Sequence, residues 1–496
     1  MNITETLRSE IAALISGNHL YDTYYKQWKY LLESYIGGEE YRRAQNLIRY
    51  QLETNAEFQQ RLKNTPLENH CSSIISVYNS FLFRQEPTRD YGSIENAPEL
   101  EDFIRDADFE GKSLNQFMKD VSTWSSVFGH CWIFVTKPDV GAQTRADEIE
   151  AGSRPYLSII NPIMVLDWDF KRKGNGRYQL EYIKYLEDVN GDVRTVKKWY
   201  PDRILTTVVD LKKNEVIEEQ EQPNGLGKIP CVLAYNKHST FRGIGISDIS
   251  DIADAQKFIY NSTSEVQQAI AMDSHPSLVK SKETNAGVGP GSLIEMPDNL
   301  DPGLKPYALE FSGGNIASIY ESIRHTITAI DKMANTGAVR ATEAKTISGV
   351  AMETEFQLLN AKLSEKADNL ELAEEQMWKL WCEYQGYEWT GTIDYPGSFN
   401  IRDTSSEIQQ LKTAKEASTS PELIQHIDKE IANWLEVDLE GTSDTPKPIN
   451  LAEHPPVQSI DDMVAHLRQM VAEGYTDQQI KDTHPELARL FNPTEE

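Results

Sequence analysis

The chain has 496 residues, more than the about 100–200 of a typical domain, so two to four structural units are expected. Its 49 lysines and arginines against 77 aspartates and glutamates leave a formal charge of −28, which argues against a sequence-specific DNA-binding protein. The longest apolar runs fall far short of the roughly 18 residues of a membrane-spanning helix, and Glu5, Arg8 and Glu10 interrupt any secretory signal, which indicates an intracellular protein. Widely separated cysteines fit neither a zinc site nor a disulfide framework and are expected to be buried thiols: Cys71, Cys131, Cys231 and Cys382.

The first half of the chain is predicted to be an α+β unit. Up to residue 128, apolar residues recur at spacings of three and four, which indicates helices, one of them capped by Ser113. From about His130 to Asn236 the apolar period changes to two and β-branched residues accumulate, which indicates strands. Glycine-containing turns at 174–176 and 190–192 favour hairpins, so these strands are expected to pair antiparallel.

Two helices that flank a small β segment are predicted in the middle of the chain. The first follows Gly245, with Ser247 as N-cap and Asp248 in the first turn, and His275–Pro276 ends it. Residues 276–312 are rich in glycine and proline around short apolar stretches, which is typical of strands and turns. The second helix is indicated by isoleucines at helical spacing: Ile316, Ile319, Ile323, Ile327 and Ile330.

A small-residue loop, a long helix and an acidic end follow. The loop spans 333–349, and the apolar periodicity from Val350 to Trp381 predicts a helix of about 32 residues, or about 48 Å, which is too long for the interior of a small domain. Residues 389–399 return to a strand pattern. Residues 403–496 are predicted to be helical and contain 19 acids and 7 bases, a net charge of −12.

No catalytic residue, cofactor or metal site is predicted. The segment Phe109–Ser113 is similar to the end of a phosphate-binding loop, but Asp106 stands where that motif requires glycine, so a turn before the helix is favoured. The histidines form no zinc-binding pair, and the stretch 188–192 is better explained as a hairpin turn than as a calcium loop. The sequence also lacks a GxSxG nucleophile motif.

The order of these elements resembles the portal proteins of tailed double-stranded DNA bacteriophages. The stretches GGEEYRRAQNLIRY and TISGVAMETEF are similar to sequences of that family. The resemblance implies a mainly helical α+β fold with the family's named parts. These are a wing (1–244), a first stem helix (245–274), a clip (275–312), a second stem helix (313–335), a tunnel loop (336–348), a long wing helix with a returning strand (349–402) and an acidic helical crown (403–496).

The resemblance also implies a function. A ring, with twelve subunits expected, would occupy one capsid vertex of the virion after assembly in the bacterial cytoplasm, and double-stranded DNA would pass through it during packaging and ejection. Expected partners are the terminase large subunit, a head-completion or adaptor protein, the major capsid and scaffolding proteins, and DNA without sequence specificity. No membrane partner is expected. An acidic wall suits a conduit, because each neutralised phosphate releases counterions and would hold the DNA.

Three groups of charged residues are candidates for sites under this resemblance. Arg340 and Lys345 are expected in the tunnel loop, touching the DNA backbone without reading bases, although two solvated loop bases remain the alternative. Clip residues that would contact the motor or adaptor, or else be solvated hairpin charges, are Lys280, Lys282 and Glu283. Stem residues that would line the channel or bridge subunits are Glu321, Arg324, His325, Asp331 and Lys332.

Two other classes of function stay open from the sequence. The first is a soluble α+β enzyme with dispersed catalytic residues, which would be a monomer or small oligomer with a deep apolar pocket. The second is an acidic scaffold or adaptor that binds a basic partner through residues 403–496, so that truncation of that segment would abolish binding.

Overall fold

The computed structural model describes residues 11–141, 144–274, 277–279, 285–286, 294–295, 301, 307–309, 314–340, 349–399, 413 and 415. The chain forms two compact units, Met1–Ile401 and Arg402–Glu496. All helices and strands with bounds given below lie in the first unit. The predicted crown falls almost wholly outside the described residues. Among the residues described, no helix combines the length and apolar character needed to span a membrane.

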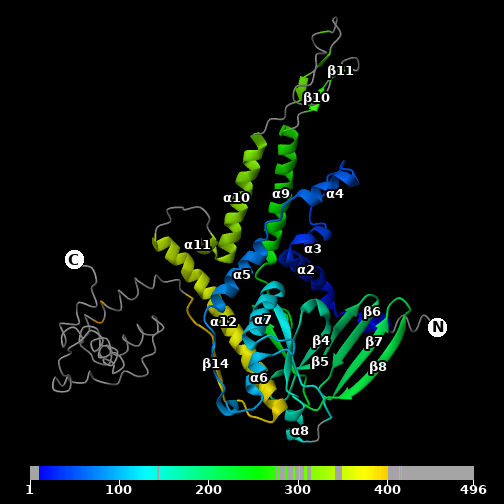
Figure 1. The fold of residues 1–496 in the computed structure, drawn as a ribbon, viewed down its shortest axis with the longest axis vertical. Helices are drawn as coiled ribbons and strands as arrows, with labels where there is room; N and C mark the ends of the chain where they lie inside the picture. The colour runs from blue at the N-terminus through cyan, green and yellow to red at the C-terminus, as the bar shows by residue number, and fades with distance from the viewer. Residues whose placement is uncertain are drawn as a thin grey trace, which may run out of the picture. The chain divides into compact units, whose positions relative to one another are not determined.

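A helical layer forms the N-terminal part of the first unit, as predicted (Figure 1). Ser113 caps the last of these helices by accepting a hydrogen bond from the Gln116 backbone, which confirms the predicted start. The α-helices are α2 (His19–Ile36), α3 (Gly38–Arg43), α4 (Asn55–Asn64), α5 (His70–Leu82), α6 (Leu100–Arg105) and α7 (Leu114–Phe128), with a 3-10 turn η1 (Gly92–Ile94) before α6.

Two antiparallel sheets follow the helical layer. The smaller has the order β3-β2-β9, and the larger has the order β4-β5-β6-β7-β8. The turns at 174–176 and 190–192 join β4 to β5 and β5 to β6, so the predicted hairpins are confirmed. The strands are β2 (His130–Thr136), β3 (Tyr156–Ile160), β4 (Val165–Arg172), β5 (Tyr178–Asn190), β6 (Val193–Trp199), β7 (Arg203–Asp210), β8 (Glu215–Pro223) and β9 (Cys231–Tyr235), with α8 (Arg145–Glu150) and η2 (Pro162–Met164) between them.

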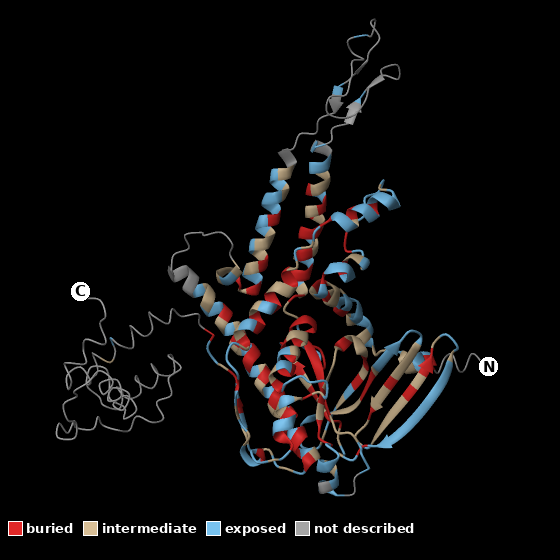
Figure 2. Ribbon diagram, in the orientation of Figure 1, coloured by how far each residue is buried: buried red, intermediate tan, exposed pale blue. Residues whose placement is uncertain are grey.

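The main hydrophobic core lies where α7 and α12 (Gly349–Gln385) meet the smaller sheet (Figure 2). Strand β2 is buried at six of its seven residues, which is why its sequence is continuously apolar rather than alternating. Trp132 and Phe134 from β2 and Trp378 and Trp381 from α12 are among the largest fully buried side chains. The long helix therefore belongs to the core of this unit along much of its length.

The stem pair, α9 (Ser250–Ser274) and α10 (Gly314–Ala334), extends away from that core (Figure 1). Between the two helices the described residues form short antiparallel strand pairs, β10 (Ser277–Val279) with β13 (Tyr307–Leu309) and β11 (Asn285–Ala286) with β12 (Ile294–Glu295). The predicted order of helix, β segment and helix is thus present. After α10 come α11 (Gly337–Arg340) and α12, and β14 (Thr392–Asp394) then pairs with β1 (Thr88–Asp90).

Two element boundaries differ from the sequence-based expectation. Helix α9 begins at Ser250 rather than at Gly245, because the Ile246 carbonyl, which would accept from the Ser250 N–H in a helix, accepts from the Asn236 side chain instead. At Gly245 an added Cβ would lie 1.9 Å from the Gly129 carbonyl oxygen, so glycine allows this close approach. The long helix runs for 37 residues, about 55 Å, and thus exceeds the predicted 32.

Candidate functional site

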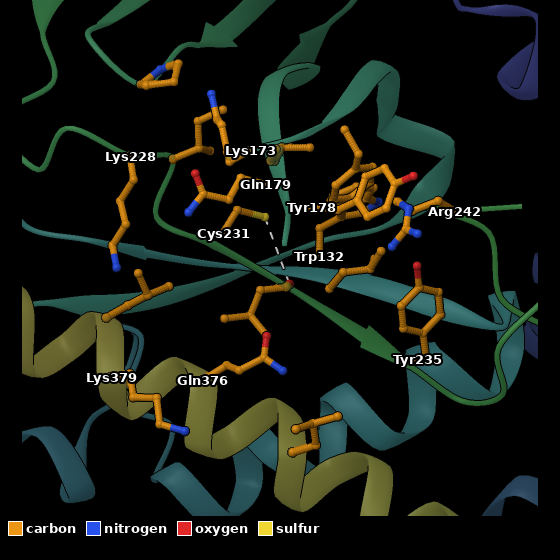
Figure 3. A pocket seen from close by; sticks show the side chains of 18 of the residues that line it. Trp132, Lys173, Tyr178, Gln179, Lys228, Cys231, Tyr235, Arg242, Gln376 and Lys379 are labelled. Atoms are coloured by element: carbon orange, nitrogen blue, oxygen red, sulfur yellow. Dashed lines mark hydrogen bonds between the residues drawn. The ribbon is translucent and has the colours of Figure 1, made fainter. Parts of the chain in front are cut away.

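A cleft of about 590 Å³ lies between α12, β5 and β9 (Figure 3). Burial raises the pKa of the Cys231 thiol well above its ordinary value, which disfavours the nucleophilic thiolate. The lysines and the arginine of the cleft are engaged within the chain: Lys228 with Glu383, Lys379 with Glu375, Lys173 with Glu181, and Arg242 over the Tyr178 ring. The described lining therefore offers no activated nucleophile for the enzyme interpretation.

Of the two stem helices, α10 is the less buried. On α10 the buried residues are Ile323, Ile330 and Ala334, while Ile316, Ile319 and Ile327 are partly buried against the core cluster. The predicted isoleucine stripe is thus the packed face of α10. Other apolar side chains of the pair stay exposed, namely Phe258, Ile270, Tyr320 and Met333. The packing of α9 against α10 thus leaves these four apolar side chains open to solvent.

The predicted stem charges fall into two groups. Four of the predicted residues are exposed on α10, namely Glu321, Arg324, His325 and Lys332. Asp331 differs, because its carboxylate is only 13% exposed and pairs with Arg340. Asp331 therefore belongs to an ion pair within the chain, whereas the other four predicted side chains are exposed.

Arg340 is not a free base of a loop. It ends the short helix α11, and its Nη1 lies 2.8 Å from Asp331 Oδ1. Its Nη2 lies 2.8 Å from Nδ1 of His70 on α5. Burial first, and then the Arg340 charge, lower the pKa of His70, so the ring is held in its neutral form beside the guanidinium. Arg340 thus joins the base of α10 to α5.

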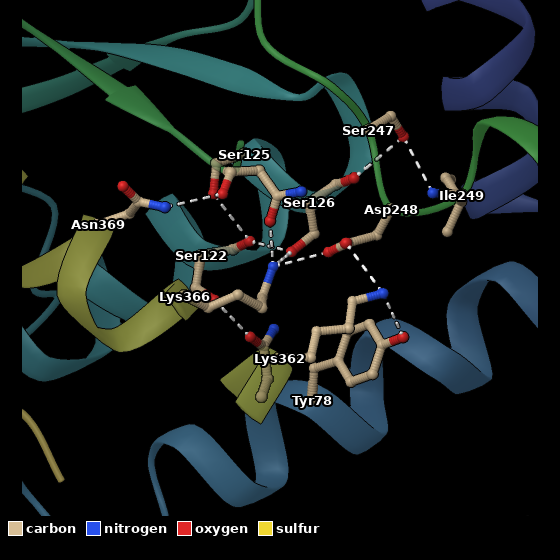
Figure 4. A network of polar contacts seen from close by, with 12 residues as sticks. Tyr78, Ser122, Ser125, Ser126, Ser247, Asp248, Ile249, Lys362, Lys366 and Asn369 are labelled. Carbon is tan, nitrogen blue, oxygen red and sulfur yellow. Dashed lines mark hydrogen bonds and ion pairs between the residues drawn. The ribbon is translucent and has the colours of Figure 1, made fainter. Parts of the chain in front are cut away.

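A network of buried charges lies at the base of the stem pair (Figure 4). Asp248, just before α9, accepts from Lys366 Nζ at 2.7 Å and pairs with Lys362 Nζ at 3.3 Å, and both lysines come from α12. Lys362 also donates to the Tyr78 hydroxyl at 2.8 Å, and that hydroxyl donates to the Ala334 carbonyl at 2.6 Å. One chain of contacts therefore links the start of α9, the end of α10, α5 and α12.

Lys366 is the most deeply placed cation of this network. Its side chain is 5% exposed, and its Nζ donates to Ser126 Oγ at 2.7 Å and to Asn236 Oδ1 as well as to Asp248. Burial by itself would raise the pKa of Asp248, but Lys366 and Lys362 outweigh it and hold the pKa at about 2. The carboxylate is therefore ionised at neutral pH, and the network depends on that charge.

Several predicted site residues lie outside the described residues. They are Lys280, Lys282 and Glu283 of the predicted clip and Lys345 of the predicted tunnel loop. Within the described ranges, no group of three or more histidine, cysteine, aspartate or glutamate side chains could hold a metal ion.

Sequence reasoning missed most of the network at the base of the stem. Asp248 was expected only as a favourable first-turn acid, and Lys362, Lys366 and Tyr78 were not singled out. One signal was present: Lys366 falls within the helical apolar spacing that includes Leu363 and Leu370. A lysine on an apolar helix face indicates a buried charge with a partner, although the spacing does not name the partner.

The described fold is thus a core unit of helices and antiparallel sheets from which the helix pair α9 and α10 extends. The family model described as "Phage portal protein, SPP1 Gp6-like" matches residues 23–474. The match covers most of the chain, so the chain belongs to this family of phage portal proteins. Portal proteins are a structural family of phage-like particles.

Two solved structures that match this chain are parts of gene transfer agent (GTA) particles. One, the neck of an empty GTA particle computed with C6 symmetry, has 10% identity and a TM-score of 0.45, covering 81% of this chain and 99% of that one. Another, the neck of a native GTA particle computed with C12 symmetry, has 12% identity and a TM-score of 0.42, covering 82% and 99%. A search of curated proteins gave no match.

Proposed function

We propose that this chain is one subunit of a closed ring, with twelve copies, that forms a conduit for double-stranded DNA at a capsid vertex. The observation that carries the proposal is the stem pair, whose helices of 25 and 21 residues leave apolar side chains exposed. A pair of long helices with uncovered apolar residues is explained when neighbouring copies cover them. Family membership supports the same reading.

The charge of the chain supports passage of DNA rather than binding. A formal charge of −28 per copy keeps a closely spaced ring from neutralising many phosphates, so DNA can slide. Exposed α10 side chains of both signs, Glu321, Arg324, His325 and Lys332, are our candidates for the channel wall or the subunit contacts. We assign the clip residues Lys280, Lys282 and Glu283 to contacts with the terminase and an adaptor protein.

Assembly into a ring is the first test of this proposal. The monomer is 56.4 kDa, so twelve copies would weigh about 677 kDa. Light scattering on a sizing column, with negative-stain images of the same peak, is expected to show that mass and a central hole. A chain that stays a monomer at every concentration would contradict the proposal, and binding of a small molecule by that monomer would favour the enzyme interpretation.

The tunnel-loop bases are tested by Arg340→Ala and Lys345→Ala. Arg340→Ala is expected to lower the stability of the fold by about 1–3 kcal/mol, since it leaves Asp331 without its buried partner. Contact of Arg340 with DNA would require this pair to open, so we assign the larger share of DNA contact to Lys345. The double variant is expected to form rings that package less DNA, measured by nuclease-protected DNA per particle.

The control for this test is Lys379→Ala, which removes an exposed base of the wing helix. It is expected to leave packaging unchanged. Rings of the double variant that package as much DNA as the wild type would contradict the assigned role of both tunnel-loop bases.

A further inference from the structure

The loop between α3 and α4 presents three apolar side chains to solvent. Leu52 is 97% exposed, Ile48 is 63% exposed and Tyr50 is 40% exposed. Single exposed apolar residues are common on protein surfaces, but three within five positions concentrate exposed apolar surface on one loop. We call Ile48, Tyr50 and Leu52 the knob.

The knob is held in place by buried polar contacts. Arg61 of α4 is only 4% exposed, and it donates to Glu53 Oε1 at 2.7 Å, to the Ile48 carbonyl at 2.6 Å and to Ser264 Oγ on α9 at 3.0 Å. The Ile48 N–H donates to Asn261 Oδ1, also on α9, at 2.7 Å. The hydrogen bond from Arg61 lowers the pKa of Glu53, so this pair stays charged at neutral pH.

Such anchoring fixes the backbone of the loop, and with it the positions from which the exposed apolar side chains project. Leu52 faces solvent and gains almost no burial within the described fold. Apolar side chains on an anchored loop are suited to binding, because the loop backbone loses little conformational freedom on association. Contact surfaces draw most of their binding energy from a few such residues that enter a partner's surface. The knob is therefore better explained as a binding surface for another molecule than as an ordinary surface loop.

The position of the knob along the stem indicates its partner. Asn261 and Ser264 lie 11 and 14 residues beyond Ser250, or about 16–21 Å along α9. The lower ends of α9 and α10 meet at the Asp248 network, so the same distance back from Ala334 along α10 reaches residues 320–323.

At that height α10 exposes an aromatic ring and an acidic side chain, which complement the apolar and basic side chains of the knob loop. Tyr320 is 47% exposed and apolar over most of its ring, and its neighbour Glu321 is exposed. Arg49 lies within the knob loop and is also exposed. Its Nε and Nη2 donate to the uncharged Glu53 carbonyl, so its positive charge stays without an acidic partner in these two bonds and would attract Glu321 when the apolar residues meet. Related copies in a ring contact each other at equal heights through two different surfaces, and the knob and the Tyr320 region are two different surfaces at matching heights.

We propose that the knob of one copy docks on α10 around Tyr320 of the neighbouring copy. This inference rests on the proposed ring, and it assigns to that ring a specific lateral contact between the α3–α4 loop and the stem. Glu321 then becomes a residue of the subunit contact rather than of the channel wall.

The first test uses Leu52→Asp in the full-length chain. Because Leu52 is almost fully exposed, the variant is expected to fold with an unchanged melting temperature. Its rings are expected to dissociate at a protein concentration about tenfold or more above that of the wild type, measured by mass photometry over a dilution series. The matched control is Ile217→Asp on β8, where the isoleucine is 54% exposed, and it is expected to assemble like the wild type.

The second test uses a cysteine pair, Leu52→Cys with Tyr320→Cys. Oxidation of assembled rings is expected to give a ladder of covalent multimers on a non-reducing gel, and Leu52→Cys with Ile217→Cys is expected to give none. Wild-type rings together with unchanged dilution behaviour of Leu52→Asp and no ladder would overturn this contact alone. A wild-type chain that never assembles would instead contradict the proposed function, and this contact with it.

Discussion

Asp248→Asn is expected to destabilise the folded chain by about 3–5 kcal/mol, because it leaves Lys366 buried without a counter-charge. The side chains of Lys366 and Asp248 are 5% and 7% exposed, so water cannot take over the lost interaction. Ser126 and Asn236 would still accept from Lys366 Nζ, but neither carries a charge. Urea unfolding followed by circular dichroism measures the change in the free energy of unfolding.

The controls for this prediction come from the same helices. Asp251→Asn changes an exposed acid in the first turn of α9 and is expected to cost less than about 1 kcal/mol. Adding Lys366→Met to Asp248→Asn is expected to restore much of the lost stability, since an apolar side chain replaces the unpaired cation. An Asp248→Asn variant that unfolds at the wild-type urea concentration would contradict the structural role of this pair.

The same pair predicts a dependence of stability on pH. The pKa of Asp248 is about 2 in the folded chain, below the about 3.9 of an unfolded aspartate. A lowered folded-state pKa stabilises the fold above the unfolded pKa, and this contribution of about 2–3 kcal/mol is lost as the pH falls from about 4 to 2. The stability difference between wild type and Asp248→Asn is therefore expected to shrink over that interval.

Glu374→Gln, nearer the C-terminal end of α12, is expected to lower the free energy of unfolding by about 3–5 kcal/mol. Glu374 is fully buried, and its Oε1 lies 2.6 Å from Arg89 Nε on β1. Its Oε2 accepts from the Tyr395 hydroxyl at 2.6 Å, and its Oε1 accepts from Trp378 Nε1 at 3.3 Å. The glutamine amide carries no charge to pair with Arg89. Its NH₂ group would also face the N–H and O–H groups of Arg89, Trp378 or Tyr395, which are themselves donors.

The adjacent residue provides the control for Glu374→Gln. Glu375 pairs with Lys379 on the surface, four residues further along α12, so Glu375→Gln is expected to change stability by less than about 0.5 kcal/mol. Hydrogen exchange of Thr392–Asp394 should rise in Glu374→Gln, because strand β14 pairs with β1, which carries Arg89. Equal unfolding midpoints for the two variants would show that Glu374 does not hold this part of the fold.

Local features of the sequence were sufficient for much of the fold. The start of α7 at Ser113, the two hairpins, the isoleucine face of α10 and the long helix each depend on residues a few positions apart. Helical and strand periodicities are properties of the local backbone, so they can be read without knowing the tertiary fold. The order of those elements was also enough to indicate the portal family.

Contacts between distant segments were decided only by the tertiary structure. Arg340 contacts His70 across 270 positions of sequence, and Lys366 contacts Asp248 across 118 positions. Spacing could mark Lys366 as a buried lysine, but its partner depends on how α12 packs against the start of α9. A buried charge is stable only beside a partner that the whole fold brings to it, whereas a helix forms from its own hydrogen bonds and apolar spacing. The sequence alone therefore determined the elements and their order, and the packing of those elements decided that Arg340 and Asp331 join α10 to α5.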